Sequence, residues 1–344
     1  MTATATIELI DSDLEATLDG YSTESRALAQ ESAARLVANI ETVVHGRRAA
    51  VEMVVIGLLS GGHALLQDTP GTGKTTLARA VARSVGGTFR RIQGTVDLLP
   101  GDITGSAMWS PLTQEFTFVP GPVFANLLLV DELNRATPRA QSALLEAMEE
   151  STITVDGVCH RLPDPFFVIA TQNPSGQHGT FPLPEGQLDR FAVALSLGKN
   201  DLATERRIVR EQLLRPTVDD VRPVLTLDDL RRLQFEVRRT FVSDGVVDFA
   251  LAVIAATHSH PRVRVGASSR ATLSLVRCCQ ARALLSGRAY VTPDDVKALA
   301  PNALGHRLAL SAGGSGAYVV EDTTDAGVSV VRDVLTDVPV PLRG

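Results

Sequence analysis

The stretch DTPGTGKT, residues 68–75, decides the fold of this 344-residue chain. It closes an apolar run, residues 64–66, and opens a helical pattern over residues 77–85. A strand, a glycine-rich loop and a helix in this order are the setting of a phosphate-binding loop. Gly71 and Gly73 can turn successive backbone N–H groups toward one point, where the positive end of the helix adds its dipole. The stretch therefore predicts a nucleoside triphosphate site.

The polar side chains after the glycines have expected tasks. Lys74 is expected to reach the β- and γ-phosphates, and the Thr75 hydroxyl is expected to ligate Mg²⁺. One departure is Asp68, which stands where the strict G-x-x-x-x-G-K-[ST] pattern has glycine. The alternative interpretation, a glycine-rich turn before a core helix, requires neither Lys74 nor Thr75. The residues expected to contact the nucleotide are Pro70, Gly71, Thr72, Gly73, Lys74, Thr75 and Thr76.

A second part of the site is predicted downstream, where the apolar residues 127–130 are followed by Asp131 and Glu132. A short continuous apolar run is typical of a strand buried on both faces of a parallel sheet, and ligands bind at the carboxyl ends of such strands. We expect Asp131 to hold Mg²⁺ through water and Glu132 to polarise the attacking water. An apolar strand ending in two carboxylates is more often structural, but after a phosphate-binding loop it indicates ATP hydrolysis.

Composition limits the class of protein. Thirty-three Lys and Arg residues against 39 Asp and Glu residues give a net charge of −6, which disfavours a passive DNA clamp. The three cysteines, Cys159, Cys278 and Cys279, have no metal-ligand spacing and indicate a reduced, intracellular chain. No apolar run reaches about 18 residues and the start is acidic, so we expect no membrane span or export signal and a cytoplasmic location.

The order of the predicted elements gives the fold class. Strands that alternate with helices indicate a parallel sheet covered on both sides, and the Gly- and Pro-rich pieces indicate inserted hairpins. The hairpin at 151–162 is expected to turn at Asp156-Gly157. We predict helices over 28–44, 48–60, 77–85 and 138–150, strands at 64–66, 89–92, 127–130, 166–171 and 192–197, and hairpins within 95–122 and 151–162.

After Lys199 the pattern predicts helices only. Thr226 and Thr292 each place a capping hydroxyl before acidic first-turn residues. We therefore expect a loose N-terminal tail at 1–20, an α/β nucleotide-binding domain at 21–199 and an all-helical domain at 200–344.

From about residue 33 to 341 the chain resembles the MoxR group of AAA+ ATPases. The resemblance implies a P-loop AAA+ core with a C-terminal helical lid, assembly into a ring that is usually hexameric, and chaperone-like work on protein partners that often carry von Willebrand factor A domains. It rests on seven motifs in order: PGTGKT at 70–75, PGP at 120–122, DELNR at 131–135, LLEAMEE at 144–150, ATQNP at 170–174, LDRF at 188–191 and GASSRA at 266–271.

Three further site residues follow from the resemblance. Asn173 resembles sensor 1, a polar residue that orients the lytic water; the alternative is a turn-forming Asn before Pro174. Arg190 resembles the arginine finger that reaches the next subunit; the alternative is an ion pair with Asp189 or Glu185. Arg270 resembles sensor 2, which links nucleotide state to lid angle; the alternative is a solvated helix residue.

Other positions stay open. Asn134 and Arg135 belong to a charged turn that has structural as well as catalytic uses. The family commonly has proline at Ser269, and glutamine at Arg47, so the contacts to the base are not assigned. The two inserts line the pore in one interpretation and decorate the edge in the other.

The sequence thus predicts an ATP- and Mg²⁺-dependent ring that remodels protein clients. A nucleic-acid-translocating motor is the alternative from another class, although the acidic balance and the lack of a recognised reading module disfavour it. A nucleotide-gated scaffold with slow turnover is a third possibility, and the combination of Lys74, Asp131, Glu132, Asn173 and Arg190 disfavours it.

Overall fold

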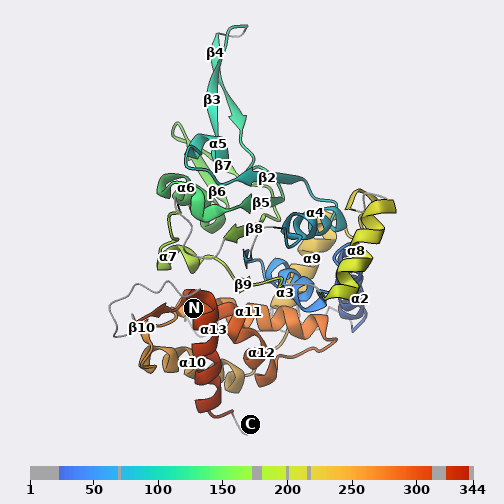
Figure 1. Ribbon diagram of the computed structural model, residues 1–344, viewed down its shortest axis with the longest axis vertical. Helices are drawn as coiled ribbons and strands as arrows, with labels where there is room; N and C mark the ends of the chain where they lie inside the picture. Colours follow the sequence, from blue (N-terminus) through green and yellow to red (C-terminus); the bar gives the residue numbers. More distant parts are fainter. Residues whose placement is uncertain are drawn as a thin grey trace, which may run out of the picture.

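The computed structural model describes residues 23–68, 71–112, 114–172, 180–198, 201–214, 218–311 and 323–340. A sheet of parallel strands lies between helices, two hairpins extend from one side, and a mainly helical unit packs below it (Figure 1). The expected tail at 1–20 lies outside the described residues. Among the described residues we find no helix with the length and apolar character that crossing a bilayer requires.

The central sheet has five strands in the order β2-β5-β8-β1-β9, and all of its pairs are parallel. The carboxyl ends of the strands therefore share one edge of the sheet and the amino ends share the other. The strands are β1 (Ala64–Gln67), β2 (Phe89–Gln93), β5 (Leu127–Asp131), β8 (Phe167–Gln172) and β9 (Val193–Leu195).

Alternation along the strands divides the core into two layers. In β5, Leu127 and Leu129 join one buried cluster, whereas Leu128 and Val130 join the other. The first cluster packs against α2 (Thr23–Glu41), α3 (Arg48–Leu59), α4 (Lys74–Ser84) and the C-terminal helices, and the second packs against α6 (Pro138–Glu150). The predicted parallel sheet with helices on both faces is confirmed.

Two hairpins interrupt the α/β core, as the sequence predicts. β3 (Gly105–Ser110) pairs with β4 (Glu115–Pro120) after the short helix α5 (Pro100–Thr104), and β6 (Thr152–Val155) pairs with β7 (Val158–Arg161). Asp156 and Gly157 have φ of 50° and 80°, the left-handed values of a tight hairpin turn. The Phe118 ring of the first hairpin stacks on the His160 ring of the second, with centroids 4.1 Å apart.

The C-terminal part is mainly helical, and two of its helices begin at the predicted caps. Asp229 N donates to Thr226 Oγ1 while Thr226 N donates to Asp229 Oδ2. At the second cap, Thr292 N and Thr292 Oγ1 both donate to Asp295 Oδ2. The helices are α8 (Leu202–Leu214), α9 (Leu227–Arg238), α10 (Asp244–Ser259), α11 (Ser269–Leu285), α12 (Pro293–Leu304) and α13 (Thr323–Asp337), and short 3-10 turns lie at η1 (Leu133–Arg135), η2 (Val218–Asp220) and η3 (Gly305–Arg307).

The expectation of helices only beyond residue 199 is wrong in one place. A short antiparallel ladder joins β10 (Val263–Val265) to β11 (Ala309–Leu310). The β-branched run after Pro261 is too short for a helix of its own, so its backbone groups pair with the segment that follows η3.

A buried arginine fastens this helical part to the sheet. Arg307 donates to Asp189 Oδ1 at 2.7 Å and to the carbonyl oxygen of Phe191 at 2.8 Å, and it is only 6% exposed. Asn302 Nδ2 donates to the carbonyl oxygen of Ala194 in β9 at 2.9 Å. The segment that enters β9 is therefore held from the helical side.

Candidate nucleotide-binding site

The glycines of the predicted phosphate loop have the backbone that the loop requires. Gly71 and Gly73 have φ of 85° and 90°, and Gly73 caps the N-terminus of α4. No atom lies within 4 Å of a Cβ built at either position, so the requirement for glycine is conformational rather than steric. Thr69 and the predicted Pro70 contact lie outside the described residues.

Lys74 is the first residue of α4 and its side chain is buried in the loop. The residue is 8% exposed, and its Nζ donates to the carbonyl oxygen of Asp68 at 2.8 Å. Burial lowers the pKa of the ammonium group, while the nearby carboxylates of Asp68, Asp131 and Glu132 oppose the shift. The charges of three carboxylates thus favour the protonated form of one buried amine at the start of the helix.

The structure explains the departure at Asp68. Its carboxylate accepts from Ser196 Oγ at 2.7 Å, from Leu197 N at 2.6 Å and from Gly198 N at 3.2 Å. These donors lie just after β9, the neighbour of β1 in the sheet. Asp68 therefore ties the start of the phosphate loop to the segment that leads into the helical part, which a glycine cannot do.

Asp131 and Glu132 stand at the carboxyl end of β5, as predicted. Thr171, at the end of β8, links them: its Oγ1 accepts from Glu132 N at 2.8 Å and lies 3.4 Å from Asp131 Oδ1. Glu132 has φ of 54°, a left-handed conformation that is uncommon for a non-glycine residue. The turn packs so closely on Gly94 that a Cβ there would lie 2.2 Å from Glu132 O.

These side chains meet in one cavity of about 210 Å³ at the carboxyl edge of the sheet. The structure thus brings together most of the predicted loop residues with Asp131 and Glu132. Sequence reasoning missed Arg91, Gln93 and Thr171; the polar ends of the neighbouring strands β2 and β8 are the signal that could have found them. The cavity is lined by Gly71, Gly73, Lys74, Thr75, Thr76, Arg91, Gln93, Asp131, Glu132 and Thr171.

The two predicted arginines lie elsewhere, on a shared carboxylate. Arg190 Nε donates to Glu149 Oε2 at 2.8 Å, and Arg270 Nη2 donates to Glu149 Oε1. The donors from Arg270 and Arg190 hold the pKa of the Glu149 carboxyl below its usual range. The ion pair of Arg190 is therefore made with Glu149. Asp189, one partner that the alternative interpretation named, pairs with Arg307 instead, and the Glu185 side chain lies outside the described residues.

Strand direction separates the two groups. Arg190 precedes β9. Glu149 lies in the last turn of α6 next to Met148, whose carbonyl oxygen is hydrogen-bonded to the ring of His63 just before β1. Both positions mark the amino edge of the sheet, whereas the phosphate loop follows the carboxyl end of β1. Arg190 and Arg270 are accordingly absent from the residues that line the cavity.

The predicted sensor, Asn173, lies outside the described residues. The residue before it, Gln172, ends β8, and this strand lies between β5 and β1 in the sheet. The strand that precedes Asn173 therefore ends at the edge where the phosphate loop and Asp131 lie.

The donor set at the carboxyl edge suits a hard cation. The Thr75 hydroxyl and the Asp131 carboxylate offer oxygens, the donor type that Mg²⁺ prefers, and Mg²⁺ usually completes its shell with water and substrate phosphates. Among the described residues there is no cluster of three or more His, Cys, Asp or Glu side chains of the kind that encloses a metal without such help. The residues present thus fit a metal that arrives with a nucleotide.

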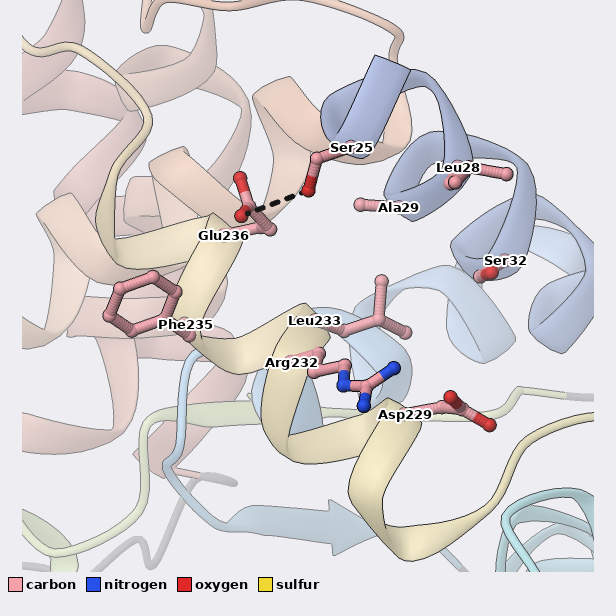
Figure 2. Close-up of a pocket in the computed structure, with 9 residues that line it drawn as sticks. All are labelled: Ser25, Leu28, Ala29, Ser32, Asp229, Arg232, Leu233, Phe235 and Glu236. Carbon is pink, nitrogen blue, oxygen red and sulfur yellow. Dashed lines mark hydrogen bonds between the residues drawn. The ribbon is translucent and has the colours of Figure 1, made fainter. Parts of the chain in front are cut away.

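Larger cavities lie away from this chemistry. One of about 530 Å³ lies between α2 and α9, where Ser25 Oγ donates to Glu236 Oε1 at 3.5 Å (Figure 2). Two of its polar residues, Asp229 and Arg232, come from the first turns of α9, whose N-terminus is already capped by Thr226. Size alone therefore does not identify the nucleotide site.

Comparison with known proteins agrees with this geometry. A family model described as the ATPase family associated with various cellular activities (AAA) matches residues 63–193, and a model of the AAA lid domain matches residues 255–325. A crystal structure of a candidate ATPase from Cytophaga hutchinsonii superposes with a TM-score of 0.84 at 30% identity, covering 96% of this chain and 99% of that one. Fold and site define an AAA-type ATPase core with a helical lid.

Two relatives narrow the class. The uncharacterized protein YeaC of Bacillus subtilis is 41% identical over 90% of this chain and 95% of its own length. Chaperone MoxR1 of Mycobacterium tuberculosis is 40% identical over 80% of this chain and 75% of its own length. The chain belongs to the MoxR family of AAA+ ATPases. It is therefore an ATP-binding ATPase.

Proposed function

We propose that this chain is a Mg²⁺-dependent ATPase that assembles into a ring, usually of six copies, and remodels protein clients in the manner of a chaperone. The observation that carries the proposal is the division of the site: the phosphate loop and two carboxylates lie at one edge of the sheet, and two arginines lie at the other. The name of the relative chaperone MoxR1 supports the chaperone-like role. A client with a von Willebrand factor A domain is the partner class that we favour.

Within one subunit, the residues at the carboxyl edge have separate tasks. Lys74 neutralises the β- and γ-phosphates, and the Thr75 hydroxyl and Asp131 hold Mg²⁺, which would screen the phosphate charge. Glu132 takes the proton of the attacking water. Its Oε2 accepts from Arg135 Nη1 at 2.8 Å, a contact that fixes the carboxylate beside the cavity. Asn173 orients the same water in this scheme.

We assign Arg190 to the neighbouring subunit and Arg270 to the coupling of nucleotide state with the angle of the lid. A second cation near the γ-phosphate stabilises charge in the transition state, and Arg190 lies at the wrong edge of its own sheet to supply it. We propose that Arg190 is the finger that enters the site of the next copy. Arg270, at the start of α11, pairs with the same Glu149 carboxylate as Arg190. A movement of the lid would therefore change this shared contact.

The proposed work reaches clients through the first hairpin. β3 and β4 project beyond the rest of the molecule (Figure 1). Trp109 and Phe116 face each other across the ladder with ring centroids 5.2 Å apart, yet they are 53% and 70% exposed. Exposed aromatic pairs are favourable anchors for a protein surface. We place the moving parts in an α/β unit at 21–199 and a lid at 200–344.

Three variants test the mechanism. Lys74→Ala is expected to lose ATP binding, and Glu132→Gln is expected to bind ATP and stall, because Lys74 meets the ground-state phosphates whereas Glu132 acts on water. Arg190→Ala is expected to bind ATP but hydrolyse it on the order of 10³-fold more slowly. ATP hydrolysis by Glu132→Gln at the wild-type rate would show that Glu132 is not the base.

Mixing distinguishes a shared site from a complete one. Lys74→Ala and Arg190→Ala, each inactive, are expected to regain turnover in mixed rings, since certain interfaces then pair an intact loop with an intact finger. If the mixture stays inactive although mixed rings are shown to form, Arg190 has only a structural role in its ion pair. The same assay with single-stranded and duplex DNA tests the motor alternative, which strong, salt-sensitive stimulation would support.

A further inference from the structure

Arg91 forms an ion pair with Asp131, the carboxylate that we propose to hold the metal. It lies in β2, at the edge of the sheet next to β5, and its Nε donates to Asp131 Oδ2 at 2.6 Å. The Arg91 side chain is 51% exposed, whereas the Asp131 side chain is 9% exposed. An accessible guanidinium therefore neutralises a buried carboxylate inside the candidate site.

Both oxygens of Asp131 are engaged by the protein. Oδ2 accepts from Arg91, and Oδ1 lies 3.4 Å from Thr171 Oγ1. A divalent cation that approaches Asp131 would meet the charge of Arg91 at hydrogen-bond distance from the same carboxylate. Like charges this close repel, and the repulsion is stronger beside a buried group than in bulk water. The guanidinium and a metal ion thus compete for Asp131.

The surroundings allow Arg91 to leave. Its side chain is half exposed, so water already hydrates part of it. Gln93 Oε1 lies 3.5 Å from Arg91 Nη2, two residues along the same strand, and offers a second acceptor outside the carboxylate. Arg91 also lines the cavity that Lys74 and Thr75 line.

We propose that Arg91 is a resident cation that sets the affinity of the site for divalent metal by competing for Asp131. The inference rests on the proposed Mg²⁺-ATP site and adds a specific function for a residue of β2. Its consequence is opposite to that of a metal ligand or a phosphate contact, because removing Arg91 makes metal binding tighter.

The chain supplies a matched control. Arg90 is the neighbouring arginine on β2, and it is exposed but not among the residues that line the cavity. Side chains alternate across a strand, so Arg90 and Arg91 point to opposite faces. Arg90→Gln and Arg91→Gln remove the same charge from the same strand, and only the second removes it from Asp131.

The experiment measures metal binding directly. Mn²⁺ is titrated into the full-length protein saturated with ADP, and free Mn²⁺ is followed by electron paramagnetic resonance. Arg91→Gln is expected to bind Mn²⁺ roughly twofold to fivefold more tightly than the wild type, the scale of a partly exposed ion pair. Arg90→Gln is expected to match the wild type, and Arg91→Lys, which keeps the charge, is expected to lie between.

The outcomes separate two kinds of failure. Unchanged or weaker Mn²⁺ binding by Arg91→Gln, with normal ADP binding, overturns the competition. A wild-type protein that binds neither ADP nor Mn²⁺ overturns the proposed function instead. If thermal unfolding shows that Arg91→Gln does not fold, Arg91→Lys decides: tighter binding than the wild type supports the competition, and equal or weaker binding overturns it.

Discussion

The Asp68 carboxylate accepts a hydrogen bond from the backbone N–H of Leu197 at 2.6 Å. Asp68 directly follows β1 and Leu197 lies two residues after the neighbouring parallel strand β9, so the contact fixes the first residue of the phosphate loop against the entrance to the lid. A residue that departs from the strict loop pattern is thus part of the connection between the two functional units.

Asp68→Gly restores the strict pattern and is nevertheless expected to destabilise the protein. The change leaves Leu197 N, which is buried, without its acceptor and removes two further bonds. Buried unsatisfied donors cost about 1–3 kcal/mol each, so we expect a loss of roughly 2–4 kcal/mol in the free energy of unfolding. Urea denaturation measures it, and a stability equal to that of the wild type would show that these bonds contribute nothing.

Glu149→Gln is expected to weaken ATP hydrolysis without weakening ATP binding. The variant keeps the shape but loses the charge that holds Arg190 and Arg270 together, so the finger is less well oriented. We expect a fall of on the order of tenfold, less than for removal of the finger itself. The control is Glu150→Gln, an exposed neighbour in the same helix turn. Equal rates for the two variants would contradict the positioning role.

Stability is expected to fall in mild acid because His63 is buried in its neutral form. Its Nδ1 accepts from Val168 N at 3.1 Å and its Nε2 lies 3.2 Å from Met148 O, so a second proton would break the first bond. Burial lowers its pKa to about 4. The unfolded chain takes up a proton near pH 6.5, so the stabilisation is full above that pH and is lost as pH falls toward 4.

Between pH 7 and pH 5 this histidine alone removes about 2 kcal/mol. His306, whose pKa burial lowers to about 3, adds a similar loss. Urea denaturation at the two pH values measures the difference, and His63→Gln should reduce it by about half. An unchanged difference in that variant would locate the acid sensitivity elsewhere.

The aromatic residues of the first hairpin are expected to differ in their effect on stability. Trp109→Ala removes an exposed ring and should change the free energy of unfolding by less than about 1 kcal/mol. Phe118→Ala breaks the stack on His160 and the contact with Phe124, 5.6 Å between centroids, and should cost roughly 1–3 kcal/mol. Thermal unfolding compares them, and a larger effect of Trp109→Ala would argue against a surface role.

The pattern of local sequence predicted the fold well because strand and helix periods are local. Residues 127–130 indicated a strand buried on both faces. Asp156-Gly157 indicated the turn of the hairpin within 151–162. The ladder of β10 and β11 was missed because each strand is two or three residues long and its partner lies over 40 residues away in sequence. Such pairing depends on how the lid helices pack.

For the site, the residues within motifs were predictable and their partners were not. Lys74, Asp131 and Glu132 follow from a loop and a strand end. Arg91 and Glu149 belong to other elements, and nothing in their own neighbourhood shows that the sheet brings one to Asp131 or the other to Arg190. The donors that Asp68 meets, more than 120 residues away, likewise exist only in the folded chain.

The separation of loop and arginines across one sheet has a kinetic consequence under the proposed scheme. An isolated chain carries both the phosphate loop and the arginines, but its own arginines cannot reach its own loop. Turnover per chain therefore depends on protein concentration. When the protein is diluted and the rings dissociate, the rate of ATP hydrolysis falls more steeply than the concentration of chains. Each copy can therefore bind ATP alone but hydrolyses it only when it is assembled with other copies. Assembly itself then controls ATP consumption.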